Sequence, residues 1–238
     1  MLPTKLAAPP GAIPEALQIR VRRAARAMGR HGLAHAYGHV SARLDQESFL
    51  VCASRPMGCI APGEPGIRVP VQGPLPDGVL GEVRLHQQIY RLRPDVGGIC
   101  RVQPPRLMAL STMRITPRPR HGSGTYFAPC PPLWDDPALT RSDDKAGALA
   151  EKLGDARAIV MRGNGAVCVG ATIEQAACLA WLLEDAAGVE LAVRSAGAAE
   201  EGAIYTEEEI AGRAVFTGGL FERMWEFLAS GDPEADPA

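Results

Sequence analysis

The sequence has 238 residues and lacks the features that would assign it at once to a membrane or a nucleic acid. The sequence contains no run of about eighteen apolar residues, which is the length needed to span a bilayer. Its first seventeen residues also lack the basic start and apolar run of a secretion signal. Aromatic residues make up only 5% of the chain and the net charge is -2, so neither a base-stacking platform nor a basic surface is expected. These absences leave a small molecule as the expected partner.

Paired cysteines are also lacking. Six cysteines are present, but they are scattered, form no CxxC pair and have mostly apolar neighbours. This pattern is typical of buried free thiols in a reducing compartment, not of disulfides or zinc ligands. We therefore expect a cytoplasmic protein. The six are Cys52, Cys59, Cys100, Cys130, Cys168 and Cys178.

Hydrophobic periodicity predicts one mixed α/β domain over residues 13–228, preceded by a loose arm (1–12) and followed by a polar tail (229–238). An Asn-Gly turn signal separates the last two strands, and a capping box at 172–175 opens the longest helix. Helices are expected at 13–30, 82–93, 142–153, 172–192, 207–215 and 221–228, and strands at 48–53, 67–71, 96–102, 158–161 and 166–169.

Four segments carry a family pattern in a fixed order: GHVSAR (38–43), GEVRLHQQIYRLRPDV (81–96), CRVQPP (100–105) and RGNGAVCVG (162–170). Together with the spacing between them they cover most of residues 13–195, and they resemble the class II aldolase/adducin family. The second segment is the most specific, because the family form is SSExxxHxxIYxxRPDV. The resemblance implies a three-layer α/β/α fold with a central, mostly antiparallel sheet. It also implies a homotetramer with active sites in clefts between subunits.

The family holds a catalytic divalent ion with an HxH pair and a third histidine, and here all three positions differ. They are occupied by Arg101, Gln103 and Asn164. A guanidinium cannot ligate a cation and repels one at short range. We therefore predict that the family's zinc site is lost and that no cofactor is bound.

The residues that remain predict altered chemistry at the same place. Glu82 occupies the position of the family's acid/base glutamate, although a helix N-terminal glutamate is the alternative interpretation. Arg101 can hold a carboxylate or stabilise an oxyanion, or it can form a structural ion pair with Glu82. Gln103 and Asn164 can donate amide N–H groups to the same oxygen.

The expected substrate is not a sugar phosphate, because Leu80 and Gly81 stand where the family has a phosphate-binding Ser-Ser. His39 lies in the GHVSAR segment, predicted as a loop facing the cleft, whereas His86 is expected to brace the structure. Aromatic residues near the C-terminus, including Phe221 and Trp225, are candidates for lining the pocket of an aromatic substrate. The alternative is that they are ordinary core residues. Further candidates for substrate binding are His39, Ser41, Ser54, His121 and Tyr126.

The leading hypothesis is a metal-independent carbon–carbon lyase, either a decarboxylase or an aldehyde-releasing retro-aldol enzyme, acting on an aromatic or conjugated hydroxy acid. One alternative is a non-catalytic assembly protein, since the adducin head keeps this fold without the metal ligands. Another is a lyase with a relocated metal held by His39, His121 and Glu82.

Overall fold

Seven strands form one sheet in the computed structural model, which describes residues 12–235. The strand order is β3-β2-β1-β4-β7-β6-β5, and every neighbouring pair is antiparallel except β5 and β6. The strands are β1 (His39–Arg43), β2 (Ser48–Val51), β3 (Ile67–Pro70), β4 (Gly98–Val102), β5 (Leu133–Trp134), β6 (Ala158–Met161) and β7 (Gly165–Gly170).

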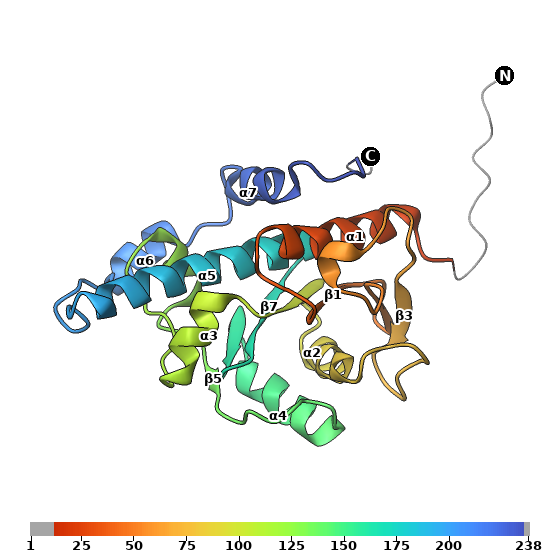
Figure 1. Cartoon of the computed structure of the whole chain (residues 1–238), viewed down its shortest axis with the longest axis horizontal. Coiled ribbons are helices and arrows are strands. Elements are labelled where there is room, and N and C mark those ends of the chain that lie inside the picture. The colour runs from red at the N-terminus through yellow and green to blue at the C-terminus, as the bar shows by residue number, and fades with distance from the viewer. Residues whose placement is uncertain (1–11, 236–238) are drawn as a thin grey trace.

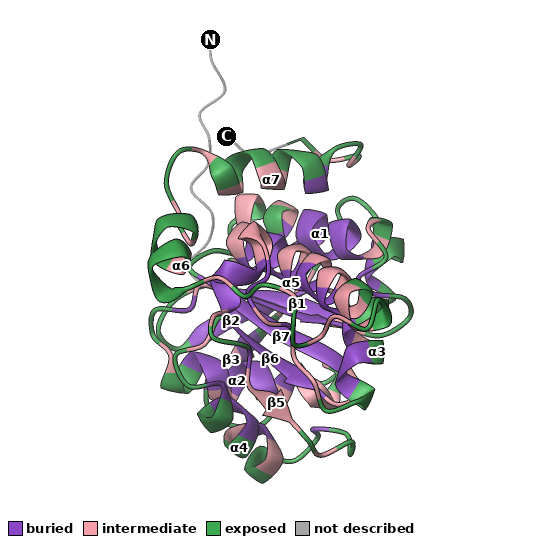
Figure 2. Ribbon diagram, turned by 90° about the vertical axis from the view of Figure 1, so that its left-hand side faces the viewer, coloured by how far each residue is buried: buried purple, intermediate pink, exposed green. Residues whose placement is uncertain are grey.

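Helices cover both faces of this sheet. The α-helices are α1 (Glu15–Arg30), α2 (Arg84–Leu92), α3 (Pro105–Thr112), α4 (Asp143–Leu153), α5 (Ile173–Ser195), α6 (Glu207–Arg213) and α7 (Leu220–Ala229). Three short 3-10 turns add η1 (Met57–Cys59), η2 (Gly81–Val83) and η3 (Gly122–Phe127). Helices α1 and α5 lie on one face, α2 and α4 on the other, and α7 packs outside α1 and α5 (Figures 1 and 2). The expected three-layer α/β/α fold with a mostly antiparallel sheet is confirmed.

Two apolar clusters, one on each face, hold the layers together. On β4 the alternation of a strand directs Cys100 and Val102 into the cluster beneath α1 and α5, and Ile99 into the cluster beneath α2 and α4. Arg101 also lies in β4, the central strand of the seven. The sequence of one strand therefore places a cation at the centre of the sheet.

Most expected helices and strands are confirmed, with a few local differences. Residues 39–43 form strand β1 instead of a loop. A helix that was not expected, α3, begins at Pro104-Pro105, since a proline in the first turn of a helix loses no hydrogen bond. Cys59 and Cys130 are exposed, while the other four cysteines are buried, and all six are free.

The segment after α7 is bound to α1 by ion pairs. Asp232 accepts hydrogen bonds from Arg26 and Arg30, and Glu234 accepts from Arg22 and Arg26. Although burial alone would raise the pKa of Asp232 and of Glu234, the arginine hydrogen bonds lower both values. The described part of the predicted tail is therefore fixed to the domain.

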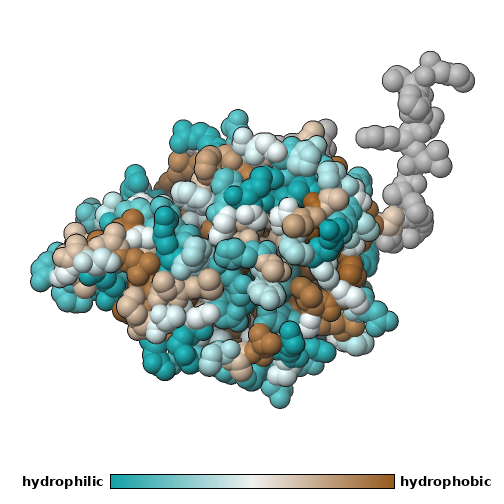
Figure 3. Space-filling model, viewed as in Figure 1, coloured by the Kyte–Doolittle hydropathy of each residue, from teal (hydrophilic) through white to brown (hydrophobic). Residues whose placement is uncertain are grey.

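The surface drawn in Figure 3 is a mosaic of hydrophilic and hydrophobic residues. Within residues 12–235, no helix is both long and apolar enough to cross a membrane.

Contact between the sheet and α5 depends on glycine at the start of β4. A Cβ atom added at Gly98 would lie 2.4 Å from Ile173 Cα, so Gly98→Ala is expected to push α5 outward and to destabilise the fold by about 1–3 kcal/mol. Gly147, within α4, has open space around it, so Gly147→Ala is expected to stabilise by about 0.5–1 kcal/mol. Urea unfolding measures both, and equal effects of the two substitutions would contradict this account.

Candidate active site

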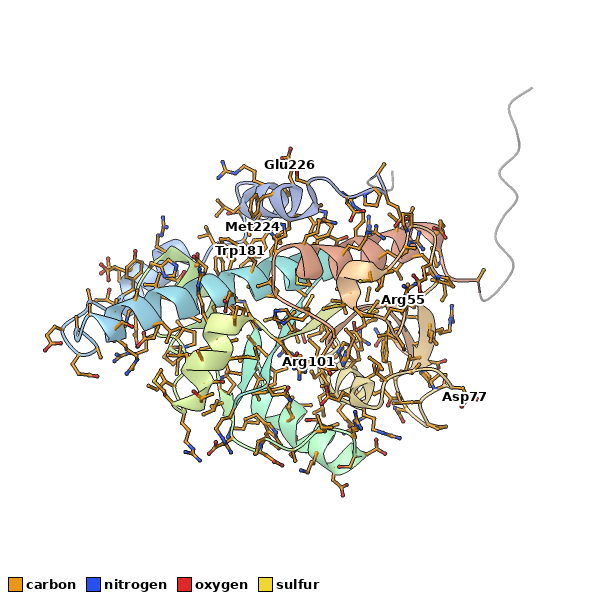
Figure 4. The ribbon with its side chains drawn as sticks, viewed as in Figure 1. Arg55, Asp77, Arg101, Trp181, Met224 and Glu226 are labelled. Carbon is orange, nitrogen blue, oxygen red and sulfur yellow. The ribbon has the colours of Figure 1, made fainter. Side chains whose placement is uncertain are left out.

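The centre of the candidate site is Arg101. Its side chain is 2% exposed, and it is among the largest fully buried side chains of the described chain. Figure 4 shows it in the middle of the molecule, away from surface residues such as Asp77. Burial lowers the pKa of Arg101 and the charge of Glu82 opposes this, but an arginine stays protonated in a protein.

Arg101 uses little of its hydrogen-bonding capacity. Its Nη1 donates to the Val102 carbonyl oxygen at 2.9 Å, its Nη2 lies 3.7 Å from Glu82 Oε2, and its Nε–H has no partner among the described residues. Arg26 is a useful comparison, because it is buried too and donates from all three nitrogens to Asp232, Glu234 and the Ile60 carbonyl. The Nε and Nη2 atoms of Arg101, which form one side of the guanidinium fork, therefore make no hydrogen bond within the described chain.

Glu82 lies beside Arg101 and is the more exposed of the two side chains. It belongs to η2, immediately before α2, and its side chain is 17% exposed. The Thr140 backbone N–H donates to Glu82 Oε1 at 3.4 Å, while Oε2 faces Arg101. The ion pair that the sequence left open is present, but at 3.7 Å it is longer than a hydrogen bond. A carboxylate in this position can exchange protons with solvent and stay next to a buried cation.

Gln103 and Asn164, the two amides, lie together as the family pattern predicts. Gln103 follows β4, Asn164 lies in the turn between β6 and β7, and Gln103 Nε2 donates to Asn164 Oδ1 at 3.0 Å. The turn approaches closely because Gly165 has a φ of 89° and a Cβ there would lie 2.1 Å from the Val102 carbonyl oxygen. The two amides hold each other and keep further N–H groups for a ligand.

Beneath Arg101, β1 and α2 contribute a buried line of polar side chains. His39 Nδ1 lies 2.9 Å from His86 Nε2, and His86 Nδ1 lies 2.6 Å from the Ser41 hydroxyl, which contacts the Tyr90 hydroxyl at 3.0 Å. His39 is directly opposite Arg101 in the pairing of β1 with β4, and its Nε2 has no partner among the described residues. The pattern could have been found from sequence, since strand and helix spacing put His39 with Ser41 and His86 with Tyr90.

Both histidines of this line are neutral. Burial, and then the charge of Arg101, lower the pKa of His39 from its ordinary value of 6.5 to about 3. Burial, then His39, and then Arg101 hold the pKa of His86 well below its ordinary value. His86 therefore braces β1 against α2, as expected, without carrying charge.

Other predicted binding residues lie elsewhere in the chain. His121 and Tyr126 line a cavity of about 360 Å³ with Arg213 and Phe221, and His121 Nε2 contacts Asp185 at 2.9 Å. Tyr126 donates to the Val215 carbonyl oxygen and packs edge-on against Phe221. Ser54 is not part of the Arg101 cluster in the described structure and donates to the Gly78 carbonyl oxygen. A single chain thus does not show the expected meeting of these residues with Arg101.

The residues at the family's metal position do not fit a metal ion. A cation and two amides replace three imidazoles, and a guanidinium cannot ligate a metal ion and repels one at short range. Nor do the described residues contain any group of three His, Cys, Asp or Glu side chains that could hold an ion, including the combination of His39, His121 and Glu82.

The chain matches known proteins over most of its length. Residues 19–191 match the family model of the class II aldolase and adducin N-terminal domain. A 3,4-dihydroxyphthalate decarboxylase of Arthrobacter keyseri is 30% identical over an aligned length of 199 residues, and the match covers 74% of this chain and 78% of that protein. The enzyme of the same name from Rhodococcus jostii is 28% identical, with 77% of this chain and 82% of that protein covered.

Solved structures agree with the fold. L-fuculose-1-phosphate aldolase from Thermus thermophilus superposes with a TM-score of 0.70 at 26% identity, covering 78% of this chain and 98% of the aldolase. An aldolase II superfamily protein from Pseudomonas syringae gives a TM-score of 0.77 at 22% identity, covering 92% of this chain and 93% of its own. The second likeness concerns the fold alone.

The neutral state of buried His39 makes the stability of the fold depend on pH. Between about pH 6.5 and pH 3 the unfolded chain binds a proton at this residue that the folded chain does not. The free energy of unfolding therefore decreases as the pH is lowered, by up to about 1.4 kcal/mol per pH unit. We expect His39→Gln to flatten the loss between pH 7 and pH 4.5, measured by urea unfolding. The matched control is His35→Gln, at an exposed position, and an identical effect of both variants would contradict the assignment.

Proposed function

From the premise that the chain belongs to the class II aldolase and adducin N-terminal domain family and is a lyase, we propose that it decarboxylates an aromatic ortho-hydroxy acid without a metal ion. The substrate class comes from the relatives that are named 3,4-dihydroxyphthalate decarboxylases. The position of Glu82 beside Arg101 supports the reaction type.

One observation carries the proposal, namely the open side of the Arg101 fork. A buried cation with unused donors is costly in a purely structural role. Arg26, by contrast, donates hydrogen bonds from all three of its nitrogens. The Nε and Nη2 atoms of Arg101 instead suit two oxygens of a carboxylate, or a phenolate next to it.

The chemistry that these groups support is protonation of the ring followed by loss of CO2. Glu82 gives a proton to the ring carbon that bears the carboxylate, and the ortho hydroxyl supplies electron density as its oxygen becomes carbonyl-like. The carbon–carboxylate bond then breaks, its electron pair restores the aromatic ring, and CO2 leaves. Glu82 takes the next proton from solvent, which its partial exposure allows. Arg101, with the amides of Gln103 and Asn164, holds the remaining anionic oxygens.

Two features set this reaction apart from sugar-phosphate cleavage. Leu80 and Gly81 precede Glu82, so the hydroxyl groups that the family offers a phosphate are missing from these positions. In addition, an ortho-hydroxy aromatic acid has its own electron sink and needs no Lewis acid. Aldehyde release from a conjugated hydroxy acid uses the same acid and the same cation, and is the second candidate reaction.

The alternatives gain less support. A non-catalytic assembly protein would favour a site filled with apolar side chains, whereas this site contains an acid, a cation and two amides. A relocated metal would need His121 near Glu82, but His121 pairs with Asp185 on α5.

We also propose that the protein works as a homotetramer with its sites between subunits. Leu80 is 42% exposed and lies two residues before Glu82 in the chain. Leu139 is 51% exposed and precedes Thr140, whose backbone N–H donates to Glu82. Apolar side chains at the rim of a polar site suit burial by a second copy. Light scattering after gel filtration gives the number of subunits.

Replacing either charged group should remove turnover of 3,4-dihydroxyphthalate. Turnover is measured by the release of CO2 and by chromatography of the product. Glu82→Gln is expected to lower kcat by about 10²–10⁴-fold, because it deletes the acid but keeps the shape. Arg101→Lys is expected to lower kcat/KM by about 100-fold, since lysine cannot form two parallel hydrogen bonds. Glu47→Gln and Arg55→Lys, at exposed positions, serve as controls. Unchanged activity in Glu82→Gln would remove it from the mechanism.

Metal independence is tested separately. Protein purified without chelator is expected to contain far less than one zinc, manganese or iron per chain by plasma mass spectrometry. Dialysis against EDTA should leave the decarboxylation rate unchanged, because Arg101 and the amides do not depend on an ion. A stoichiometric metal, or activity lost with EDTA and restored by a divalent ion, would overturn this part of the proposal.

A further inference from the structure

The buried polar line from Tyr90 to His39 ends at an unused nitrogen. Tyr90, Ser41, His86 and His39 are each at most 3% exposed, and consecutive members lie 3.0, 2.6 and 2.9 Å apart. The terminal His39 Nε2 and the Nε of Arg101 are both buried and have no partner among the described residues. Since His39 and Arg101 are paired across β1 and β4, the two side chains lie on the same face of the sheet.

Hydrogen-bond accounting gives the line a direction. Each neutral histidine has one N–H, so the proton on one ring determines the proton on the next. In one arrangement Tyr90 donates to Ser41, Ser41 to His86 Nδ1, and His86 Nε2–H to His39 Nδ1, which leaves the proton of His39 on Nε2. In the reverse arrangement His39 donates from Nδ1 and its Nε2 is a bare acceptor.

The reverse arrangement leaves a buried hydroxyl unsatisfied. Ser41 would then donate to the Tyr90 oxygen, and the described residues offer the Tyr90 O–H no other acceptor. The positive charge of Arg101 acts in the opposite sense, because it attracts a bare Nε2 lone pair. No hydrogen bond joins the two side chains, however, so this attraction compensates only part of the loss at Tyr90.

We propose that His39 Nε2–H and Arg101 Nε–H form a two-donor recess that binds one anionic oxygen of the substrate, and that Tyr90, Ser41 and His86 are positioning residues that keep the proton of His39 on Nε2. The identity of the oxygen, a carboxylate or phenolate of an aromatic hydroxy acid, rests on the proposed function. The direction of the line rests on the hydrogen bonds alone. Two donors of different kinds suit a single oxygen better than the guanidinium fork by itself, because they approach it from two strands.

The test is the tautomer of His39, read by long-range 1H–15N correlation on protein with 15N-labelled histidine. The His39 signal is assigned by its absence in His39→Gln. We expect Nε2 to carry the proton and Nδ1 to be unprotonated, unchanged from pH 8 to pH 5. A proton on Nδ1, or titration of the ring within that range, would overturn the proposal.

Ser41→Ala supplies the sharper comparison. Without the Ser41 hydroxyl, Tyr90 lacks its partner in both arrangements, so no hydroxyl opposes the reverse arrangement and Arg101 is expected to draw His39 to the Nδ1–H form. Ser48→Ala is the matched control, because that hydroxyl is bonded to Asp45 and lies outside the line. An unchanged His39 tautomer in Ser41→Ala would contradict the positioning role.

Binding of 3,4-dihydroxybenzoate, measured by calorimetry, links the tautomer to the recess. Loss of one donor is expected to weaken binding about tenfold in Ser41→Ala and not in Ser48→Ala. The two proposals fail separately. If the protein has the Nε2–H tautomer but does not turn over 3,4-dihydroxyphthalate, the proposed substrate is wrong. If the protein turns over this substrate but His39 has the Nδ1–H tautomer, the proposed recess is wrong.

Discussion

The site depends on one electrostatic constraint, the burial of the Arg101 cation beside a single, incompletely bonded carboxylate. Because β4 is the central strand, Arg101 has a neighbouring strand on either side, and its side chain is 2% exposed. An interior cation of this kind suppresses protonation of any base close to it, which contributes to the low pKa values of His39 and His86. It also leaves Glu82, at the exposed edge, as the nearest group able to exchange protons with water. Charge and proton transfer are thereby divided between two neighbouring residues.

Two buried carboxylates elsewhere in the fold have several hydrogen-bond partners each. Glu190 accepts from Arg120 and Arg194, and Glu184 accepts the backbone N–H groups of Arg106 and Leu107 at the start of α3. Two apolar clusters enclose the sheet on either side. At Arg101, by contrast, unused donors lower the stability of the fold and remain available for binding.

Periodicity predicted most of the fold, because amphipathic helices and alternating strands leave the same pattern whatever their partners. It failed where an element is short: β1 contains five residues and α3 begins with a proline that reads as a stop. The structure places Glu82 beside Arg101 and Gln103 beside Asn164, which the family pattern had put at one site, but spacing could not locate His121. The irregular segment before β5 brings His121 against α5, and its contact with Asp185 depends on a path that no local pattern encodes. The hydrogen bond between Gln103 and Asn164 was also out of reach, because residue type does not tell whether two donors face a ligand or each other.

A guanidinium at this position changes what the substrate has to bring. A divalent ion accepts electron pairs from a growing enediolate, whereas Arg101 only attracts charge and donates hydrogen bonds along fixed directions. The substrate must therefore delocalise its own electrons, which an ortho-hydroxy aromatic acid does and a sugar phosphate does not. Decarboxylation also consumes one proton and one negative charge, since a carboxylate becomes neutral CO2. Each turnover thus weakens the attraction to the Arg101 cation that held the substrate, and the same charge that favours binding of the acid favours release of its less anionic product.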